Sequence, residues 1–149
     1  MRSRVPRSAP EGESLLRVCV QLLGDKHVAD LRAYDVRGVS SITDFFLVGS
    51  VRNDRQMKAA GQNLTRQLKH AGVHAFHRDG DFGGGTWVVL DYLDCIVHLF
   101  SAAARQHYNI EGMWRGHELS IAGWQQAARP AALPPAVQQQ PEPGEDAGP

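Results

Sequence analysis

Apolar residues recur at helical spacing in two segments of this chain. The first segment ends at Gly24, and its apolar stripe consists of Leu15, Leu16, Cys19, Leu22 and Leu23. The second segment opens at Asn53, with Gln56 placed three residues later as in a capping box, and ends at Gly72. Its apolar stripe consists of Met57, Ala60, Leu64, Leu68 and Ala71. The pattern predicts two amphipathic helices, each of which packs one face on a sheet.

Short runs rich in β-branched and aromatic residues lie around these helices and predict strands. The runs cover residues 28–36, 44–49, 73–76, 87–90 and 96–100. Apolar residues barely alternate in the last two runs, so both faces of these strands should be covered, as they are in the centre of a sheet. Residues 91–94 join these two strands as a tight turn.

A third helix is predicted after Ser101, which is placed as an N-cap. The polar and aromatic residues that follow at a spacing of three are Arg105, Tyr108, Glu111 and Trp114. These residues should share one helical face, which favours a role for that face in binding a partner. The predicted order is α-β-β-α-β-β-β-α. It favours an α/β fold in which helices pack on a mixed, roughly five-stranded sheet, because short hairpin links coexist with a helical crossover.

The two ends differ in composition from the middle of the chain. Residues 1–10 form a basic arm, and residues 125–149 contain mainly alanine, proline, glutamine and acidic residues with little to bury. Both ends are therefore expected to be disordered, which leaves a single domain over residues 11–124. The arginines of the arm could contact rRNA or begin a transit peptide, but ten residues are short for a transit peptide, and we expect a solvated tail. Residues 80–85 are rich in glycine and predict a flexible loop.

The overall charge is balanced, with 16 basic and 16 acidic residues. No bulk basic field is therefore available to hold nucleic acid by counterion release. The two cysteines, Cys19 and Cys95, lie inside apolar runs, where buried free thiols are common. We expect a reducing, cytoplasmic setting. No apolar run is long enough for a membrane span or a secretory signal, so we expect neither.

Three patterns invite an enzymatic or ligand-binding interpretation. Gly49-Ser50 at the end of a strand is typical of the opening of a nucleotidyltransferase site, but the Asp-x-Asp pair that holds metal there is missing from residues 60–64. The glycines at 83–85 precede a strand and lack the lysine of a phosphate loop. His74 and His77 should point to opposite faces of a strand. We therefore expect no enzymatic activity, no cofactor and no metal site.

Residues 86–115 carry a more specific pattern. It consists of Trp-Val-x-Leu-Asp-Tyr-x-Asp-x-x-Val-His-x-Phe, followed by Arg-x-x-Tyr-x-x-Glu and a tryptophan. Together with blocks at residues 31–36, 43–48 and 55–59, this pattern resembles the ribosomal silencing factor family, also called RsfS or Iojap, over residues 15–114. The resemblance implies a nucleotidyltransferase-like topology without catalytic groups. Leu93 departs from the family's usual turn glycine, and Asn109 departs from a usual aspartate.

The resemblance also implies a function. A member of this family would bind the large ribosomal subunit by docking on its fourteenth ribosomal protein, and would sterically block joining with the small subunit, which represses translation. Contact with rRNA should be at most secondary, because the charge of the chain is balanced. Tyr92 lies at the turn tip, where its ring should be exposed. The expected partner-binding residues are Trp87, Asp91, Tyr92, His98, Arg105, Tyr108 and Trp114.

Structural roles remain open for the same residues. Asp91 and the neighbouring Asp94 suit turn capping, and the residues of the last helix could cover the sheet edge. Trp87 suits a core position, and His98 suits a hydrogen-bonded sheet histidine. Two other function classes also remain open. They are a nucleotide-binding or nucleotidyltransferase-like enzyme on the same scaffold, and a homodimeric adaptor whose aromatic face pairs with itself. A silencing factor could also form a homodimer when free.

Overall fold

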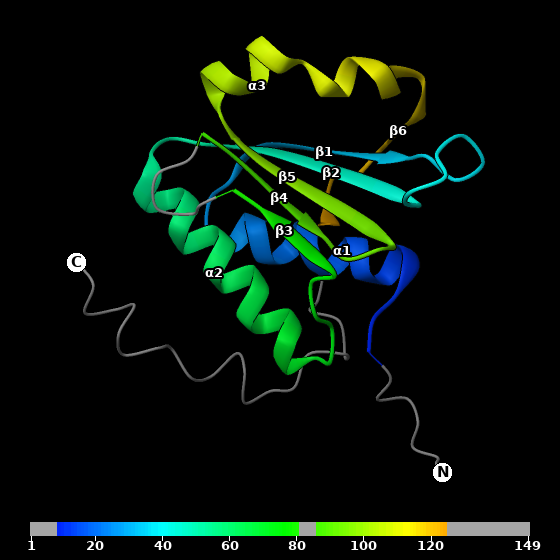
Figure 1. Cartoon of the computed structure of the whole chain (residues 1–149), viewed down its shortest axis with the longest axis horizontal. Coiled ribbons are helices and arrows are strands. Elements are labelled where there is room, and N and C mark those ends of the chain that lie inside the picture. The colour runs from blue at the N-terminus through cyan, green and yellow to red at the C-terminus, as the bar shows by residue number, and fades with distance from the viewer. Residues whose placement is uncertain (1–8, 81–85, 125–149) are drawn as a thin grey trace.

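The computed structural model describes residues 9–80 and 86–124 (Figure 1). The predictions for the two ends and for the glycine-rich loop fall almost wholly outside these residues. The elements are, in order, α1 (Gly12–Asp25), β1 (Ala29–Asp35), β2 (Phe45–Val51), α2 (Asp54–His70), β3 (His77–Asp79), β4 (Trp87–Asp91), β5 (Cys95–Ser101), α3 (Ala102–Tyr108), the 3-10 helix η2 (Ile110–His117) and β6 (Glu118–Leu119). The predicted order is confirmed as far as α3, while η2 and β6 were not predicted.

The strands form one mixed sheet of six strands in the order β3-β4-β5-β2-β1-β6. β2 and β5 run parallel at its centre, with Phe45 opposite Cys95 and Val51 opposite Ser101. The remaining pairs in this sheet are antiparallel. Because parallel neighbours need a crossover, the chain passes through α2 and the β3–β4 hairpin between β2 and β5. The mixed α/β fold is thus confirmed, with one strand more than the roughly five expected.

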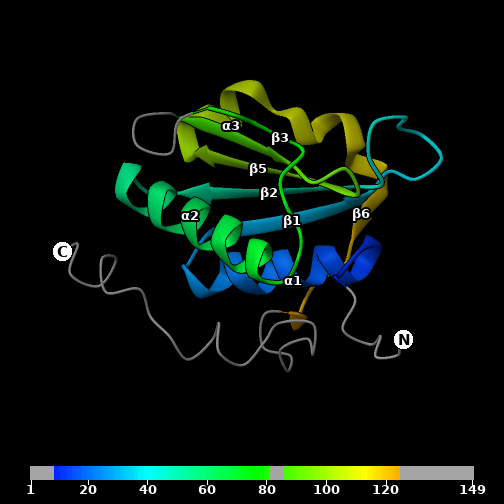
Figure 2. The ribbon, with the colours of Figure 1, turned by 60° about the horizontal axis from the view of Figure 1, so that its bottom comes forward.

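Helices cover both faces of the sheet (Figure 1, Figure 2). α1 and α2 lie on one face and enclose the main core, to which β2 contributes Phe45 and Leu47. α3 and η2 lie on the other face over a smaller core, to which β2 contributes Phe46 and Val48. This burial on both sides explains why the central strands barely alternate in polarity. Within the described residues, no helix is both long enough and apolar enough to cross a membrane.

Side-chain caps start two helices where the sequence predicts. Oδ1 of Asn53 accepts the Gln56 N–H at 2.8 Å at the start of α2. Oγ of Ser101 accepts the Ala104 N–H at 3.1 Å at the start of α3. The Gln56 side chain does not complete a reciprocal capping box, because its Oε1 accepts the Arg52 N–H at 2.6 Å. Its amide group donates to two carbonyls at the end of α1, so Gln56 ties the two helices of this layer together.

The two outer strands differ from the sequence prediction. β3 begins at His77, after the predicted run of residues 73–76. The Val73 N–H bonds to the Leu68 carbonyl at 2.8 Å and so belongs to the end of α2. β6 has only two residues and pairs with β1 through Leu119 opposite Ala33. A strand this short has no periodicity of its own, so it could not be found from the sequence.

Candidate protein-binding surface

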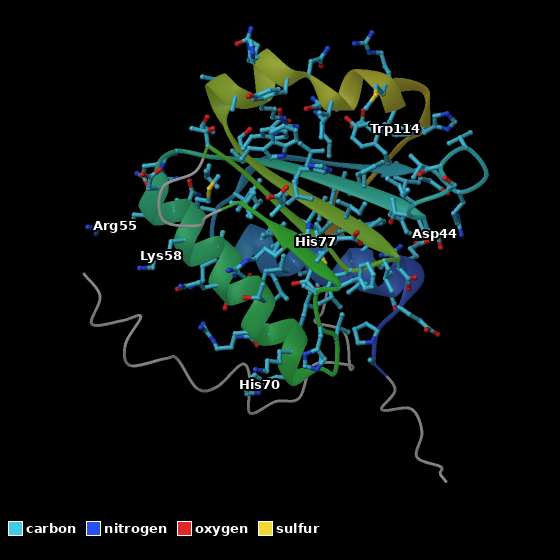
Figure 3. All side chains as sticks on the ribbon, in the orientation of Figure 1. Asp44, Arg55, Lys58, His70, His77 and Trp114 are labelled. Carbon is cyan, nitrogen blue, oxygen red and sulfur yellow. The ribbon has the colours of Figure 1, made fainter. Side chains whose placement is uncertain are left out.

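Five side chains form a continuous aromatic row on the α3 side of the sheet. We call this row the aromatic surface, and its members are Tyr108, Trp87, His98, Phe46 and Trp114. The ring centroids of Tyr108 and Trp87 lie 4.7 Å apart, and those of Trp87 and His98 lie 6.0 Å apart. Phe46 follows at 5.5 Å from His98, and Trp114 stacks on Phe46 at 5.1 Å. Figure 3 labels Trp114 at the η2 end of this row.

Sheet register brings the row together. His98 and Phe100 alternate on β5, and β4 places Val89 opposite His98 and Trp87 opposite Phe100. The rings of Trp87 and Phe100 stack with centroids 4.8 Å apart. On the other side of β5, the parallel strand β2 places Val48 opposite His98, which sets Phe46 on the same face. The aromatic surface is therefore a product of strands far apart in the sequence.

The outer members of the aromatic surface remain accessible. Tyr108 is 52% exposed, and Trp87 and Trp114 are half-buried. Met113, the neighbour of Trp114 on η2, is also exposed. Aromatic residues and methionine are enriched at protein–protein interfaces, where they supply contact area at low conformational cost. The composition of this surface therefore fits a protein partner.

His98 occupies the middle of the row and is 7% exposed. Its Nδ1 accepts the indole N–H of Trp87 at 3.1 Å, so the neutral ring carries its proton on Nε2. Among the described residues, no hydrogen-bond partner reaches that buried Nε2. Burial lowers the pKa of His98 to about 4, which keeps the ring neutral near pH 7. This geometry is compatible with both expected roles of His98. Its Nδ1 makes it a hydrogen-bonded sheet histidine, and its Nε2–H remains available to donate to a partner.

Arg105 was expected to face a partner, but the structure places it inside the molecule, with 7% of its surface exposed. Its Nε and Nη2 donate to the two oxygens of Glu111 at 2.8 and 3.0 Å, in a bidentate pair. Its Nη1 donates to Oγ of Ser50 on β2 at 2.9 Å. Arg105 therefore ties α3 to η2 and to the sheet.

The last α-helix is shorter than the sequence predicts. α3 ends at Tyr108 because Asn109 takes a left-handed conformation with a φ of 46°. The chain then continues as the 3-10 helix η2, which carries Glu111 and Trp114. Arg105 turns inward to Glu111, while Tyr108 points to the aromatic surface.

Tyr92 was expected to expose its ring at the turn tip, and this expectation is also wrong. Its side chain is 5% exposed and belongs to the main core on the α1 side of the sheet, opposite the aromatic surface. The exposed residue of the turn is Leu93, which takes a φ of 71°. Burial raises the pKa of Tyr92, whose hydroxyl lacks a hydrogen-bond partner among the described residues. The geometry gives Tyr92 a core position.

The two turn aspartates make the capping bonds that were left open. Oδ1 of Asp91 accepts the Leu93 N–H at 2.8 Å, which closes the β4–β5 turn. Oδ2 of Asp94 accepts the Gly12 N–H at 2.9 Å at the start of α1. Both carboxylates therefore stabilise local backbone.

Gly49 and Ser50 take part in packing. A Cβ atom on Gly49 would lie 2.5 Å from Cγ1 of Val28 and 2.8 Å from Cδ2 of Leu31, so a larger residue here would have to displace both side chains. The Ser50 hydroxyl is held by Arg105. Within residues 9–80 and 86–124, no group of three or more histidine, cysteine or acidic side chains is arranged to hold a metal ion.

Sequence reasoning missed Phe46, Phe100 and Met113. The run 44–49 is apolar throughout, so its alternation could not assign Phe46 to a face. Only the parallel register with β5 places this ring beside His98. Met113 was missed because its exposure depends on the 3-10 turn after Asn109.

Comparison with known proteins finds similar sequences over most of the chain. Residues 7–146 match the family model described as "Ribosomal silencing factor during starvation". The ribosomal silencing factor RsfS of Bacillus subtilis is 30% identical over 102 residues, which cover 68% of this chain and 86% of the relative. Its counterpart in Zymomonas mobilis is 34% identical over 102 residues, which cover 68% of this chain and 76% of the relative.

More distant and structural relatives extend this comparison. The mouse protein named "Mitochondrial assembly of ribosomal large subunit protein 1" is 26% identical over 101 residues, which cover 64% of this chain and 42% of the mouse protein. A crystal structure of a Chromobacterium violaceum protein is 29% identical, with a TM-score of 0.67, and the match covers 75% of this chain and 92% of that one. On the family match, the sequence identities and the shared fold, this chain belongs to the ribosomal silencing factor family.

Proposed function

We propose that this protein binds the large ribosomal subunit through its fourteenth ribosomal protein and so prevents joining with the small subunit. The observation that carries the proposal is the aromatic surface, in which the exposed ring of Tyr108 and the half-buried rings of Trp87 and Trp114 lie in one row with a histidine that has an unused N–H donor. Family membership supports a ribosomal role. The name of the mouse relative, which refers to assembly of the large ribosomal subunit, supports the choice of subunit.

The chemistry of the aromatic surface suits a protein partner. Trp87, Tyr108 and Trp114 offer large, stiff rings, which neighbouring rings hold in place before binding. Trp87 stacks on Phe100 and contacts Tyr108, and Trp114 stacks on Phe46. A surface that is ordered in advance loses little side-chain entropy on association. A few such rings, buried in pockets of the partner, can supply most of the binding free energy.

His98 gives the docking site one directional element. Its Nε2–H is buried among apolar groups, and a buried donor without an acceptor costs about 1–3 kcal/mol. A backbone carbonyl or a carboxylate of the partner would recover this cost, if neighbouring rings shift enough to admit it. Because burial lowers the pKa of His98 to about 4, the ring stays neutral and keeps its tautomer at neutral pH.

The proposed mechanism is steric, so no bond is made or broken. The bound protein occupies volume that the small subunit needs, and its effect depends on its affinity and concentration relative to those of the small subunit. Arg105 contributes indirectly, because its pair with Glu111 fixes the position of η2 and hence of Trp114.

Co-sedimentation with separated ribosomal subunits tests this proposal. We expect the full chain to migrate with free large subunits and to be scarce in the fractions of small subunits and of joined ribosomes. Recovery in equal amounts from all fractions, or none with the large subunit, contradicts the proposal. A self-associating adaptor would instead sediment as a dimer and ignore the subunits.

A further inference from the structure

The outward side of α2 concentrates positive charge. The helix contains four basic residues against one acidic residue, Asp54. Since the whole chain has 16 of each kind, the rest of the chain holds 12 basic and 15 acidic residues. The balanced total therefore hides an uneven distribution. Figure 3 shows Arg55 and Lys58 projecting from the start of α2, on the side away from the sheet.

The basic residues of α2 form a single stripe. Its members, which we call the α2 stripe, are Arg55, Lys58, Arg66 and Lys69, with the polar Gln62 between them. Their spacing of three and four residues keeps them within one side of the helix. The opposite side is buried and holds Met57, Leu64 and Leu68. At 1.5 Å per residue, the stripe extends over roughly 20 Å.

Folding of α2 does not account for this arrangement. Arg55 lies in the first turn, where the helix dipole disfavours a cation. Arg55 and Lys58 are three residues apart, a spacing at which like charges repel, and the same holds for Arg66 and Lys69. In the part of the chain that the structure describes, Arg55, Lys58 and Lys69 form no ion pair. The position of Lys69 in the last turn suits the helix dipole, but the position of Arg55 and its spacing from Lys58 are not explained by helix stability.

The stripe also differs from a protein-docking site. The exposed large apolar residues among those described are Val39, Ile42, Phe76, Leu93, Tyr108 and Met113, and none of them lies on α2. The stripe thus lacks the apolar anchors that dominate protein–protein interfaces. A row of cations and amide groups is instead the usual means of holding a phosphate backbone.

We propose that the α2 stripe binds the phosphate backbone of RNA, without recognition of base sequence. α2 and α3 lie on opposite faces of the sheet (Figure 2), and the aromatic surface lies on the α3 side, so the same molecule can bind RNA and a protein at once. The inference goes beyond the proposed function and does not depend on it, because isolated RNA suffices as a ligand. The expectation that any rRNA contact is at most secondary rests on the balanced total charge, whereas this inference rests on the local charge of α2.

Binding of a fluorescent RNA duplex to the full chain, followed by anisotropy at several salt concentrations, tests the inference. The informative variant combines Arg55→Gln, Lys58→Gln and Lys69→Gln, because glutamine favours helices as well as these residues do. The control combines Arg17→Gln, Arg37→Gln and Arg115→Gln. These three arginines are exposed and lie outside α2, and their loss changes the net charge by the same amount.

We expect the α2 variant to lose roughly tenfold or more in affinity at low salt. We also expect the slope of log affinity against log salt to become about 3 units shallower, one for each lost phosphate contact. The control should keep the wild-type slope. Equal behaviour of the two variants, or no binding of RNA by the wild type at low salt, overturns the inference. Displacement of RNA by polyglutamate at matched charge concentration would also overturn it, because the partner would then be an acidic protein.

Discussion

The indole N–H of Trp87 donates to Nδ1 of His98 across 3.1 Å, between two neighbouring antiparallel strands. This bond orients both rings and assigns the histidine proton to Nε2. It joins the part of the aromatic surface that contains Tyr108 to the part that contains Trp114. The strength of this hydrogen bond and the protonation state of His98 therefore affect the whole docking site.

Acid should destabilise the protein through His98. Burial lowers its pKa from 6.5 to about 4 in the folded state, so between these values the unfolded chain binds more protons than the folded chain. The free energy of unfolding is therefore highest above pH 6.5. It decreases as the pH falls from 6.5 through about 4, by roughly 3 kcal/mol in total. Urea denaturation at a series of pH values measures this loss.

His98→Asn is the matched variant for that measurement. Asparagine can still accept the Trp87 N–H, but it does not titrate. We expect a flatter dependence of unfolding free energy on pH between 6.5 and 4 in the variant. Parallel curves for wild type and variant would show that His98 is solvated and not the cause.

Tyr108→Ala should weaken large-subunit binding and leave the fold intact. The ring is 52% exposed and lies on Trp87, so its removal takes away contact area without opening the core. Loss of an interface anchor costs about 2 kcal/mol, or about thirtyfold in affinity. Titration against purified large subunits measures the loss. Phe76→Ala is the control, because Phe76 is 70% exposed outside the aromatic surface, and it should bind like the wild type.

Arg105→Ala should act on stability first. The change leaves the half-buried Glu111 carboxylate without its bidentate partner, and breaking a buried pair costs about 3–5 kcal/mol. Arg105→Lys keeps the charge without the planar fork and should lose less. Thermal denaturation compares the two. A stable Arg105→Ala protein that fails only in ribosome binding would return Arg105 to the contact residues.

Leu93→Gly should stabilise the protein. Leu93 has a φ of 71°, a conformation that costs a residue with a Cβ about 1–2 kcal/mol and that glycine adopts freely. The greater freedom of glycine in the unfolded chain offsets part of this gain, so we expect a net increase of about 0.5–1 kcal/mol in unfolding free energy. The Asp91 bond to the residue 93 N–H remains available. A lower midpoint in urea would show that the exposed leucine makes contacts that outweigh its strain.

Local features of the fold could be predicted from the sequence. Helix caps and apolar stripes are local patterns that span only a few residues. The caps at Asn53 and Ser101 and the stripes of the first two helices therefore predicted α1, α2 and the start of α3. The positions of the central strands followed from their apolar runs. What failed depends on contacts between distant residues.

The failures have specific physical causes. Arg105 and Tyr108 look equivalent in the sequence and both lie on α3, but Arg105 pairs with Glu111 beyond the turn at Asn109 and is buried, while Tyr108 is exposed. Tyr92 is buried because it continues the alternation of Val88 and Leu90 on β4 into the main core, and the exposed residue of the turn is Leu93. The aromatic surface itself depends on the register of β2 against β5, and the register of two strands cannot be deduced from the periodicity within each strand.

The central claim is that the bound protein keeps the ribosomal subunits apart, and light scattering during subunit joining tests it most directly. Large subunits preincubated with excess protein are mixed with small subunits at the Mg²⁺ concentration that favours joining. We predict a reduced scattering amplitude that falls further as the protein concentration rises, and a near-normal amplitude with Tyr108→Ala at the same concentration. A full wild-type amplitude, on large subunits shown by sedimentation to carry the protein, would contradict the steric mechanism.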